Sequence, residues 1–286
     1  MVRHPRHRDE RQCLTWQRQV QMTLFSFMLK AVGAYPRGTR NALDMELVED
    51  QAPCPELPAS LDGFRLLHLS DLHLGRTYPE HTERMALLLT GARADVCVIT
   101  GDFRHGHFGP SDHVAGALRK VLSGVAAKQG TYAVLGNHDT LNIGEAIEEA
   151  CVRVLYNEGV PLSSDALWLG GVDDPHLYRC DRLDGALRDA PPHAFRVLLA
   201  HSPERVSEAA ALGVGLYLCG HTHGGQVRLP LLGAVHKNAR CRRGQVMGWW
   251  REGKMLGHTS PGLGTTDLPV RYLCPPRATM ITLRRG

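Results

Sequence analysis

Short apolar runs of strand length alternate along the chain with segments whose apolar residues recur at helical spacing. The main runs lie at 64–70, 95–100, 131–135, 195–200 and 214–219. Helical patterns separate several of them, at 80–93, 112–128, 143–150 and 203–212. Strands that are apolar throughout are typical of a sheet buried on both faces, and their alternation with helices favours parallel pairing. The pattern predicts an α/β fold with a mainly parallel sheet.

Other strand signals lie outside this repeat. Leu43, Met45 and Leu47 alternate with acidic residues, which predicts a half-buried strand before a proline-rich connection at 53–58. Later apolar runs cover 152–156, 166–172, 254–259, 269–274 and 278–284. The last two look antiparallel in character, so we expect a second sheet.

Residues 1–38 form a basic N-terminal segment. Between residues 13 and 32, apolar side chains such as Trp16, Leu24 and Phe27 recur at helical spacing, which predicts an amphipathic helix that a glycine-containing stretch ends. This helix either docks on the main domain or lies in a membrane interface, where anionic lipid attracts its basic flanks. Both interpretations stay open. The rest of the chain, 39–286, is expected to form the domain that carries the chemistry.

Charge and cysteine content narrow the choice of partner and compartment. The 286 residues carry a net charge of +4, of which the first 40 carry +6, so the others carry −2. This slightly acidic body disfavours nucleic acid as a partner. None of the eight cysteines forms a Cys-x-x-Cys motif, so we expect free thiols in a reducing compartment. The expected location is the cytoplasm, or the inner face of the membrane if residues 13–32 make a peripheral contact with lipid.

Five of the apolar runs end in side chains that can bind a metal. They are Asp71, His73, Asp102, Asn137, His138, His201, His221 and His223. Because the carboxyl ends of parallel strands meet at one edge of a sheet, these side chains can converge on one site. Glycines that allow tight turns come just before several of them, at Gly101, Gly136 and Gly220.

The types and number of these side chains indicate the metals. Carboxylates, imidazoles and one amide oxygen suit Mn²⁺, Fe or Zn²⁺, and we expect Mn²⁺ first. The seven candidates besides His138 exceed what one tetrahedral ion needs. Two divalent ions that share one carboxylate would use all seven, hold a hydroxide between them and stabilise an in-line displacement at phosphorus.

Together these motifs resemble the five blocks of the calcineurin-like metallophosphoesterases. The blocks are Asp71-x-His73, Gly101-Asp102, Gly136-Asn137-His138-Asp139, His201 and Gly220-His221-Thr222-His223. The resemblance covers about residues 61–226. The stretches GHTHGGQVRLP and SPGLGTTDLPVR are similar to a bacterial branch that includes membrane-associated phosphodiesterases. The resemblance implies two mixed β-sheets packed face to face and flanked by helices.

The resemblance also implies a role for each residue. It divides the ligands between two metals that share Asp102, and it makes His138 the general acid that protonates the leaving group. Asp102 and His138 are therefore the predicted catalytic residues. One metal takes Asp71, His73, Asp102 and His223. The other takes Asp102, Asn137, His201 and His221.

One loop departs from the pattern of the phosphoprotein phosphatases in this family. At the position of an Asp that orients their catalytic histidine, this sequence has His105, and Gly106 stands where they have an Arg. The guanidinium of Arg104 suits a substrate phosphate, and a surface ion pair is the alternative for it. Arg104, His105 and Asp139 are the candidate substrate contacts.

A long insertion at 227–253 follows the last ligand. Long loops beside active sites often shape substrate binding, and this one has basic residues suited to anionic groups. Its apolar residues could contact lipid or an interface: Leu231, Leu232, Trp249 and Trp250. The alternative is a loop that packs over the second sheet.

These observations predict a two-metal phosphohydrolase that cleaves a phosphodiester or pyrophosphate by attack of a metal-bridging hydroxide. The substrate would be a phosphorylated small molecule or a lipid, such as a nucleotide-linked lipid at a membrane. A phosphoprotein or other phosphomonoester phosphatase is the alternative, which the missing Asp and Arg disfavour. The acidic body disfavours a nuclease, and the complete set of ligands disfavours a scaffold without activity.

Overall fold

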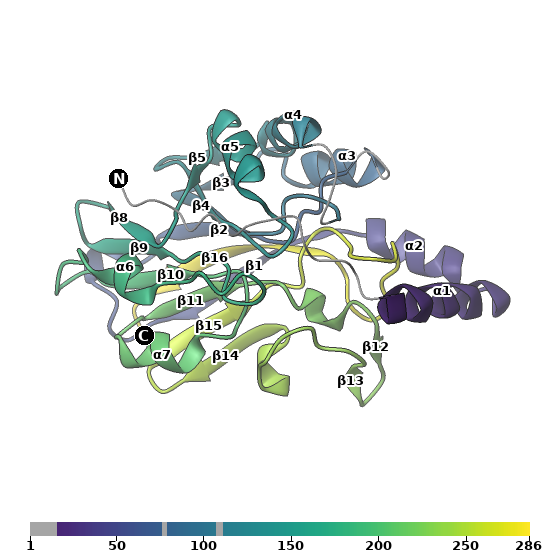
Figure 1. The fold of residues 1–286 in the computed structure, drawn as a ribbon. Coiled ribbons are helices and arrows are strands. Elements are labelled where there is room, and N and C mark those ends of the chain that lie inside the picture. Colours follow the sequence, from purple (N-terminus) through teal and green to yellow (C-terminus); the bar gives the residue numbers. More distant parts are fainter. Residues whose placement is uncertain (1–15, 76–78, 107–110) are drawn as a thin grey trace.

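Two six-stranded sheets pack face to face in the computed structural model, which describes residues 16–75, 79–106 and 111–286 (Figure 1). The first has the order β1 (Glu46–Pro53), β16 (Arg277–Arg284), β2 (Arg65–Leu69), β4 (Val96–Thr100), β6 (Thr131–Val134), β7 (Arg153–Val154). The second has the order β14 (Gly248–Glu252), β15 (Met255–Thr259), β11 (Leu216–Cys219), β10 (Phe195–Leu199), β9 (Leu167–Gly171), β8 (Glu158–Leu162). Both sheets mix parallel and antiparallel pairs, which confirms the predicted sandwich.

Apolar side chains from both sheets meet in the interior. Leu66 and Val98 of the first sheet share one buried cluster with Leu169, Val197 and Leu218 of the second. Because each strand here is apolar on the face it turns inward, closing the two sheets removes this surface from water. Such burial stabilises a fold by roughly 25 cal/mol per Å² of apolar surface.

Helices cover the outer face of each sheet. Three pack on the first: α3 (Pro79–Leu88), α4 (Asp112–Leu122) and α5 (Leu141–Glu149). Two short ones pack on the second: α6 (Leu183–Leu187) and α7 (Val206–Ala211). Figure 1 shows these two groups on opposite sides of the sandwich. The predicted βαβ alternation is thereby confirmed, and it directs the carboxyl ends of the parallel strands to one edge.

The N-terminal segment contains two helices rather than one. Helix α1 (Trp16–Ala31) confirms the predicted amphipathic helix, whose residues 13–15 lie outside the described part of the chain. A second helix, α2 (Tyr35–Leu43), occupies the stretch that the sequence pattern assigned to a break and to the start of a strand. Pro36 lies in the first turn of α2, where a missing N–H costs nothing. Among the described residues, no helix combines the length and apolar character needed to cross a bilayer.

Two further strand predictions need correction. Residues 269–274 form a loop with a single bridge between Tyr272 and Val227, because the backbone N–H of Arg271 donates to α2 instead. The run at 278–284 is the strand β16, antiparallel to β2 as expected but parallel to β1.

The insertion at 227–253 combines a hairpin with an edge strand of the second sheet. The hairpin consists of β12 (Arg228–Leu229) and β13 (Gly233–Ala234), and a 3-10 turn, η3 (Arg243–Gln245), precedes β14. Both tryptophans lie on β14, where their side chains contact the protein itself. Trp250 is buried, and its ring N–H donates a hydrogen bond to the hydroxyl of Thr259. The ring N–H of Trp249 donates to the carboxylate of Asp50. Leu231 and Leu232 are exposed at the hairpin tip.

Other short elements complete the chain. They are η1 (Ala59–Leu61), β3 (Arg93–Ala94), β5 (Ala126–Ala127) and η2 (His223–Gly225). The seven cysteines that the structure describes are all free thiols, which agrees with the sequence-based expectation for them.

Candidate metal centre

All seven predicted metal ligands lie at one edge of the sandwich, in the loops where strands of both sheets end. Those of the first sheet follow β2, β4 and β6, and those of the second follow β10 and β11. Every one of them is buried: Asp71, His73, Asp102, Asn137, His201, His221 and His223. The fold thus brings together side chains that are up to 152 positions apart in the sequence.

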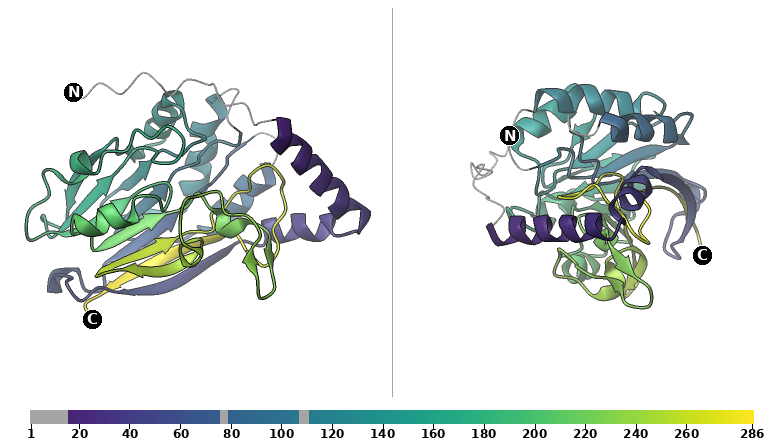
Figure 2. Two further views of the ribbon diagram at one scale, coloured as in Figure 1. Left: turned by 60° about the horizontal axis from the view of Figure 1, so that its bottom comes forward. Right: turned by 90° about the vertical axis from the view of Figure 1, so that its right-hand side faces the viewer.

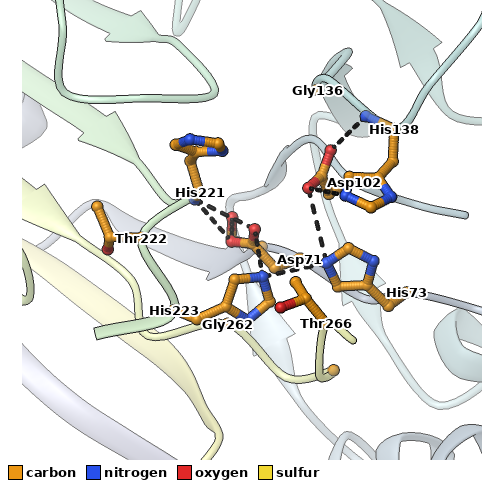
Figure 3. Close-up of polar contacts among 12 residues, drawn as sticks. Asp71, His73, Asp102, Gly136, His138, His221, Thr222, His223, Gly262 and Thr266 are labelled. Carbon is orange, nitrogen blue, oxygen red and sulfur yellow. Dashed lines mark hydrogen bonds and ion pairs between the residues drawn. The ribbon is translucent and has the colours of Figure 1, made fainter. Parts of the chain in front are cut away.

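One cluster gathers Asp71, His73, Asp102 and His223 (Figure 3). Their potential ligand atoms all lie within 4.8 Å of one another. Nε2 of His223 is 3.1 Å from Nε2 of His73 and 3.3 Å from Oδ1 of Asp71. Nε2 of His73 is 3.6 Å from Oδ2 of Asp102. This is the group that the family resemblance assigns to the first metal.

A second cluster lies on the other side of Asp102. Nε2 of His201 is 3.3 Å from Oδ1 of Asp102 and 3.0 Å from Oδ1 of Asn137. Nδ1 of His221 is 3.1 Å from the same Nε2 atom. Because Asp102 turns one carboxylate oxygen toward each cluster, the two groups share a single aspartate.

Three of the imidazoles donate a hydrogen bond to a backbone carbonyl from the ring nitrogen that faces away from the cluster. His73 donates from Nδ1 to the carbonyl of Arg104, at 3.1 Å, and His201 donates from Nδ1 to that of Thr100, at 2.7 Å. His221 donates from Nε2 to the carbonyl of Asn238, at 2.7 Å. Each of these bonds directs the other ring nitrogen at the cluster, as metal-binding histidines require.

The donor set fits divalent cations. Burial lowers the pKa of His73, His221 and His223 well below the usual range, so these rings are neutral. Against the effect of burial, His201 and His138 hold the pKa of Asp102 well below its usual range. Ring nitrogens that face each other about 3 Å apart beside carboxylates favour a positive charge between them. Neutral imidazoles with carboxylates are the ligands of Mn²⁺, Fe and Zn²⁺.

The pKa values of Asp71 and His201 also indicate that the site favours a positive charge. Burial and repulsion by Asp102 raise the pKa of Asp71 to about 7, although His201 opposes them. Burial disfavours a proton on His201, but attraction to Asp102 and Asp71 raises the pKa of His201 to about 10. The carboxylates of Asp71 and Asp102 have ligand atoms within 4.8 Å of each other, and two buried carboxylates this close are stable together only with a cation or a proton nearby.

The loops that present these ligands hold strained backbone. Five of the candidate ligands have positive φ angles, between 45° and 69°, a conformation that favours glycine. They are Asp71, His73, Asp102, His221 and His223. This conformation costs an L-residue about 1–2 kcal/mol, and it recurs at functional sites where the surrounding structure enforces it. The strain here turns successive side chains toward the same edge of the sheets.

Asp139 fixes the loop of Asp102. Its carboxylate is fully buried and accepts hydrogen bonds from the backbone amides of Asp102, Phe103, Arg104 and Gly136, at 2.8–3.3 Å. Both oxygens therefore join the loops after β4 and β6. This carboxylate is oriented toward backbone amides, and a substrate contact by Asp139 stays a prediction.

His138 stands beside the first cluster without belonging to it. Its ring centroid is 4.8 Å from that of His73, and its Nε2 is 3.9 Å from Oδ2 of Asp102. Its backbone N–H donates to Oδ1 of Asp102. The side chain is 12% exposed, whereas the carboxylate beside it is 2% exposed. His138 is thus the partly accessible group on this side of the site.

The neighbouring loop carries Arg104 and His105. The residue Arg104 is buried, and its carbonyl holds His73. The ring of His105 lies 6.1 Å from that of His73. Burial lowers the pKa of His105, although a hydrogen bond that its ring donates to the Thr265 backbone and the charge of Asp267 oppose it. Substrate contact by either residue stays a prediction, and His107 of the same loop lies outside the described residues.

Two residues near the ligands escaped the sequence analysis. The ring of His176 lies 4.1 Å from that of His221, and its Nδ1 is 3.0 Å from a carboxylate oxygen of Glu204. His176 does not end an apolar run, so no sequence signal marked it. The neighbouring Asp174 belongs to a turn, since its carboxylate accepts hydrogen bonds from the backbone N–H groups of His176, Leu177 and Tyr178.

Arg271 is the second residue that no sequence signal marked. It is fully buried, and its Nη2 donates to the carbonyls of Pro261, Gly262 and Gly264 and lies 3.5 Å from Nδ1 of His223. Its backbone N–H donates to Gly38 of α2, and its carbonyl accepts from Asn41. Arg271 therefore connects the N-terminal helices to a metal ligand.

Comparisons with known proteins agree with this geometry. The calcineurin-like phosphoesterase family model matches residues 64–225, which include all seven ligands and His138. The chain is 29% identical to YkuE, a metallophosphoesterase of Bacillus subtilis, over 84% of this chain and 86% of that protein. It is 30% identical to the phosphodiesterase YaeI of Escherichia coli, over 77% of this chain and 82% of that one.

A relative from Danio rerio is named a transmembrane protein with metallophosphoesterase domain. It is 28% identical over 93% of this chain, but the match covers only 63% of that longer protein.

Proposed function

This chain belongs to the calcineurin-like phosphoesterase family and is a phosphoester hydrolase, and from that premise we propose that it cleaves phosphodiester or pyrophosphate bonds with two divalent metal ions. The observation that carries the proposal is the pair of buried ligand clusters that share Asp102. A shared carboxylate favours two ions close together, which is the arrangement that phosphate hydrolysis uses.

The residues of the clusters would hold and orient these ions, with Mn²⁺ as the first candidate. When bound, such ions act as Lewis acids on a phosphoryl oxygen and lower the pKa of an attacking water. The chain supplies the rigidity, because backbone carbonyls hold the outer nitrogens of His73, His201 and His221. Each imidazole therefore keeps its direction before any substrate arrives.

We assign proton transfer to His138. Its imidazole lies beside the first cluster, is partly exposed and is tied through its backbone to Asp102. It would donate a proton to the oxygen of the leaving group as the bond to phosphorus breaks. Arg104 is the candidate for binding a phosphate oxygen.

A diester or pyrophosphate is the favoured substrate class for two reasons. The 102–107 loop has His105 and Gly106 at the positions where phosphoprotein phosphatases carry an Asp and an Arg. In addition, one relative of similar length is named a phosphodiesterase. Helix α1, with its exposed apolar residues Leu24, Phe27 and Met28, supports a peripheral contact with the inner face of the membrane and thus a lipid-linked substrate.

The test is hydrolysis of bis-p-nitrophenyl phosphate by the full chain with Mn²⁺, run beside p-nitrophenyl phosphate and a phosphopeptide. We expect preference for the diester. Asp102→Ala and His221→Ala should each lower kcat/KM at least about 100-fold, because each removes charge stabilisation at the reacting phosphate.

His193→Ala is the matched control, since His193 is exposed and outside both clusters. It should retain full turnover. Normal diester turnover in both Asp102→Ala and His221→Ala would refute the two-metal mechanism, and a preference for the phosphopeptide would replace the diesterase with a phosphatase.

A further inference from the structure

The tip of the β12–β13 hairpin exposes apolar side chains that the fold does not use. Leu231 is fully exposed and Leu232 is 67% exposed, with Leu229 and Val235 exposed beside them. The hairpin begins three residues after η2, and the side chain of Arg228 donates to the carbonyl of Gly224 within that turn. A leucine pair in water at the end of a hairpin contributes nothing to the core, so its position favours contact with another apolar phase.

The hairpin and the N-terminal helices form one continuous surface. The backbone N–H of Arg228 donates to the carbonyl of Tyr272, and the hydroxyl of Tyr272 donates to the carbonyl of Ala34, just before α2. Helix α1 packs against α2. The hairpin and the two helices lie at the same end of the molecule in Figures 1 and 2.

We name this surface the docking face and define it by its exposed apolar residues. They are Leu24, Phe27, Met28 and Val32 of the α1 region, Leu229, Leu231, Leu232 and Val235 of the hairpin, and Leu273 between them. These nine residues are most of the exposed large apolar residues among the described part of the chain, and they come from three separate segments.

The charge of these segments is strongly one-sided. Residues 20–43 and 226–247 contain eight Lys or Arg residues and no Asp or Glu. The rest of the chain therefore carries −4, against +4 for the whole. Three of the eight, Lys237, Arg240 and Arg242, line a pocket beside α7 that also contains Glu204 and Glu208, and Arg242 pairs with Glu252 at 2.8 Å. Within the part of the chain that the structure describes, the other five form no ion pair with a carboxylate. A basic and apolar face on an otherwise acidic protein is complementary to anionic lipid.

We propose that the β12–β13 hairpin inserts Leu231 and Leu232 into an anionic lipid bilayer, together with α1, and so holds the metal centre at the membrane surface. This inference rests on the proposed function, because it assigns the hairpin the role of holding the hydrolytic site at a membrane. The hairpin lies next to His223 in the sequence, and the chain after it supplies the carbonyl of Asn238 that holds His221. Lipid contact at the tip therefore brings both clusters close to the headgroups.

A bilayer explains this face better than a second copy of the chain does. A copy would bring eight more basic residues and no acidic ones from these segments to the same surface, and like charges would repel. An anionic bilayer instead offers an apolar interior to the leucines and negative headgroups to the basic residues.

The test is cosedimentation of the full chain with vesicles of mixed phosphatidylglycerol and phosphatidylcholine. Leu231→Asp/Leu232→Asp should weaken binding at least about tenfold, because both side chains lose buried methylene contacts and gain charge. Lys237→Glu/Arg243→Glu should weaken binding to these vesicles and not to pure phosphatidylcholine. Leu212→Asp is the matched control, since Leu212 is 44% exposed at the end of α7 and outside the docking face, and it should bind as wild type does.

Bis-p-nitrophenyl phosphate hydrolysis separates this inference from the proposed function. Leu231→Asp/Leu232→Asp should keep wild-type turnover of this soluble diester, which also shows that it folds. Wild-type vesicle binding by this variant overturns the inference, as does a wild-type chain that ignores the vesicles or a dimer that this variant dissociates. A wild-type chain that binds vesicles but hydrolyses no diester contradicts the proposed function alone.

Discussion

At the scale of single residues, the metal centre depends on approaches too close for a Cβ atom. A Cβ built on Gly136 would lie 2.2 Å from Oδ1 of Asp102 and 2.6 Å from its backbone nitrogen. Gly136→Ala must therefore displace the shared aspartate. Because displacement of about 1 Å at a reacting centre can cost 100-fold, we expect a loss of kcat/KM of roughly that size.

Gly116→Ala provides the control for this substitution. Gly116 lies on an exposed position of α4, and no atom lies within 4 Å of a Cβ built there. This variant should keep full activity and gain about 0.5–1 kcal/mol in the free energy of unfolding. Equal activity of both alanine variants in the diester assay would show that Asp102 tolerates the added methyl group.

The candidate metal ligands could be predicted because they follow the ends of apolar runs, and the fold brings such ends together. His176 and Arg271 could not, since the first lies on a turn and the second in a loop whose contacts are long-range. The role of Asp139 was also beyond the sequence. Its four amide partners come from two loops whose close approach only the folded sheet creates.

At the scale of elements, a histidine pair joins the two sheets. Nδ1 of His68 on β2 lies 3.1 Å from Nδ1 of His258 on β15, and both rings are buried. Burial lowers the pKa of His68 well below its usual range, and the charge of His258 lowers it further. Burial also lowers the pKa of His258 to about 4, although Asp50 opposes it.

This pair makes stability depend on pH. The unfolded chain takes up protons on these rings near pH 6.5, but the folded chain does not until about pH 4 for His258. The stabilisation is therefore complete above pH 6.5 and is lost as the pH falls toward 4. From His258 alone we expect a loss of about 2 kcal/mol between about pH 6.5 and pH 5, measured by urea unfolding.

His68→Leu/His258→Leu isolates this effect from the metal-binding histidines, which also titrate. With EDTA present, the double variant should show a smaller drop in unfolding free energy over the same range. An unchanged pH dependence would mean that the pair is protonated in the folded protein.

Elements with a strong apolar period were predicted well, and those defined by their contacts were not. The runs that became β2, β4, β10 and β11 have a clear period. Helix α2 was missed because Pro36 and the flanking glycines look like a break, yet a proline fits the first turn. The loop at 269–274 has the composition of a strand, but its backbone N–H groups donate hydrogen bonds to α2 and to the end of η2 instead of to a neighbouring strand.

At the scale of the whole molecule, the ligand clusters bridge the sandwich. In the first cluster Asp71 and His73 come from the first sheet and His223 from the second. A cation bound there connects the two sheets, so Mn²⁺ should raise the unfolding temperature. At a concentration about 100 times the Kd, the expected stabilisation is about 2.7 kcal/mol.

Thermal unfolding with and without Mn²⁺ measures this linkage. Asp102→Asn should lose most of the shift, because it weakens both clusters, whereas His193→Ala should keep it. If Asp102→Asn shifts as far as the wild type does, the ion binds elsewhere. The sandwich itself could be expected from the family resemblance and the alternation of strands and helices, but the position of β16 between β1 and β2 could not, since this C-terminal strand pairs with two strands from the N-terminal part of the chain.

The buried guanidinium of Arg271 gives the N-terminal helices a fixed geometry toward the ligands. Its backbone forms hydrogen bonds with Gly38 and Asn41 of α2, while Nη2 of its side chain lies 3.5 Å from Nδ1 of His223. Any surface to which α1 and α2 adhere is therefore met at one angle, without the rotational freedom that a flexible tether would leave. If that surface is a membrane, scissile bonds at one height above it would come within reach, and the depth of a headgroup would become a criterion by which substrates are selected.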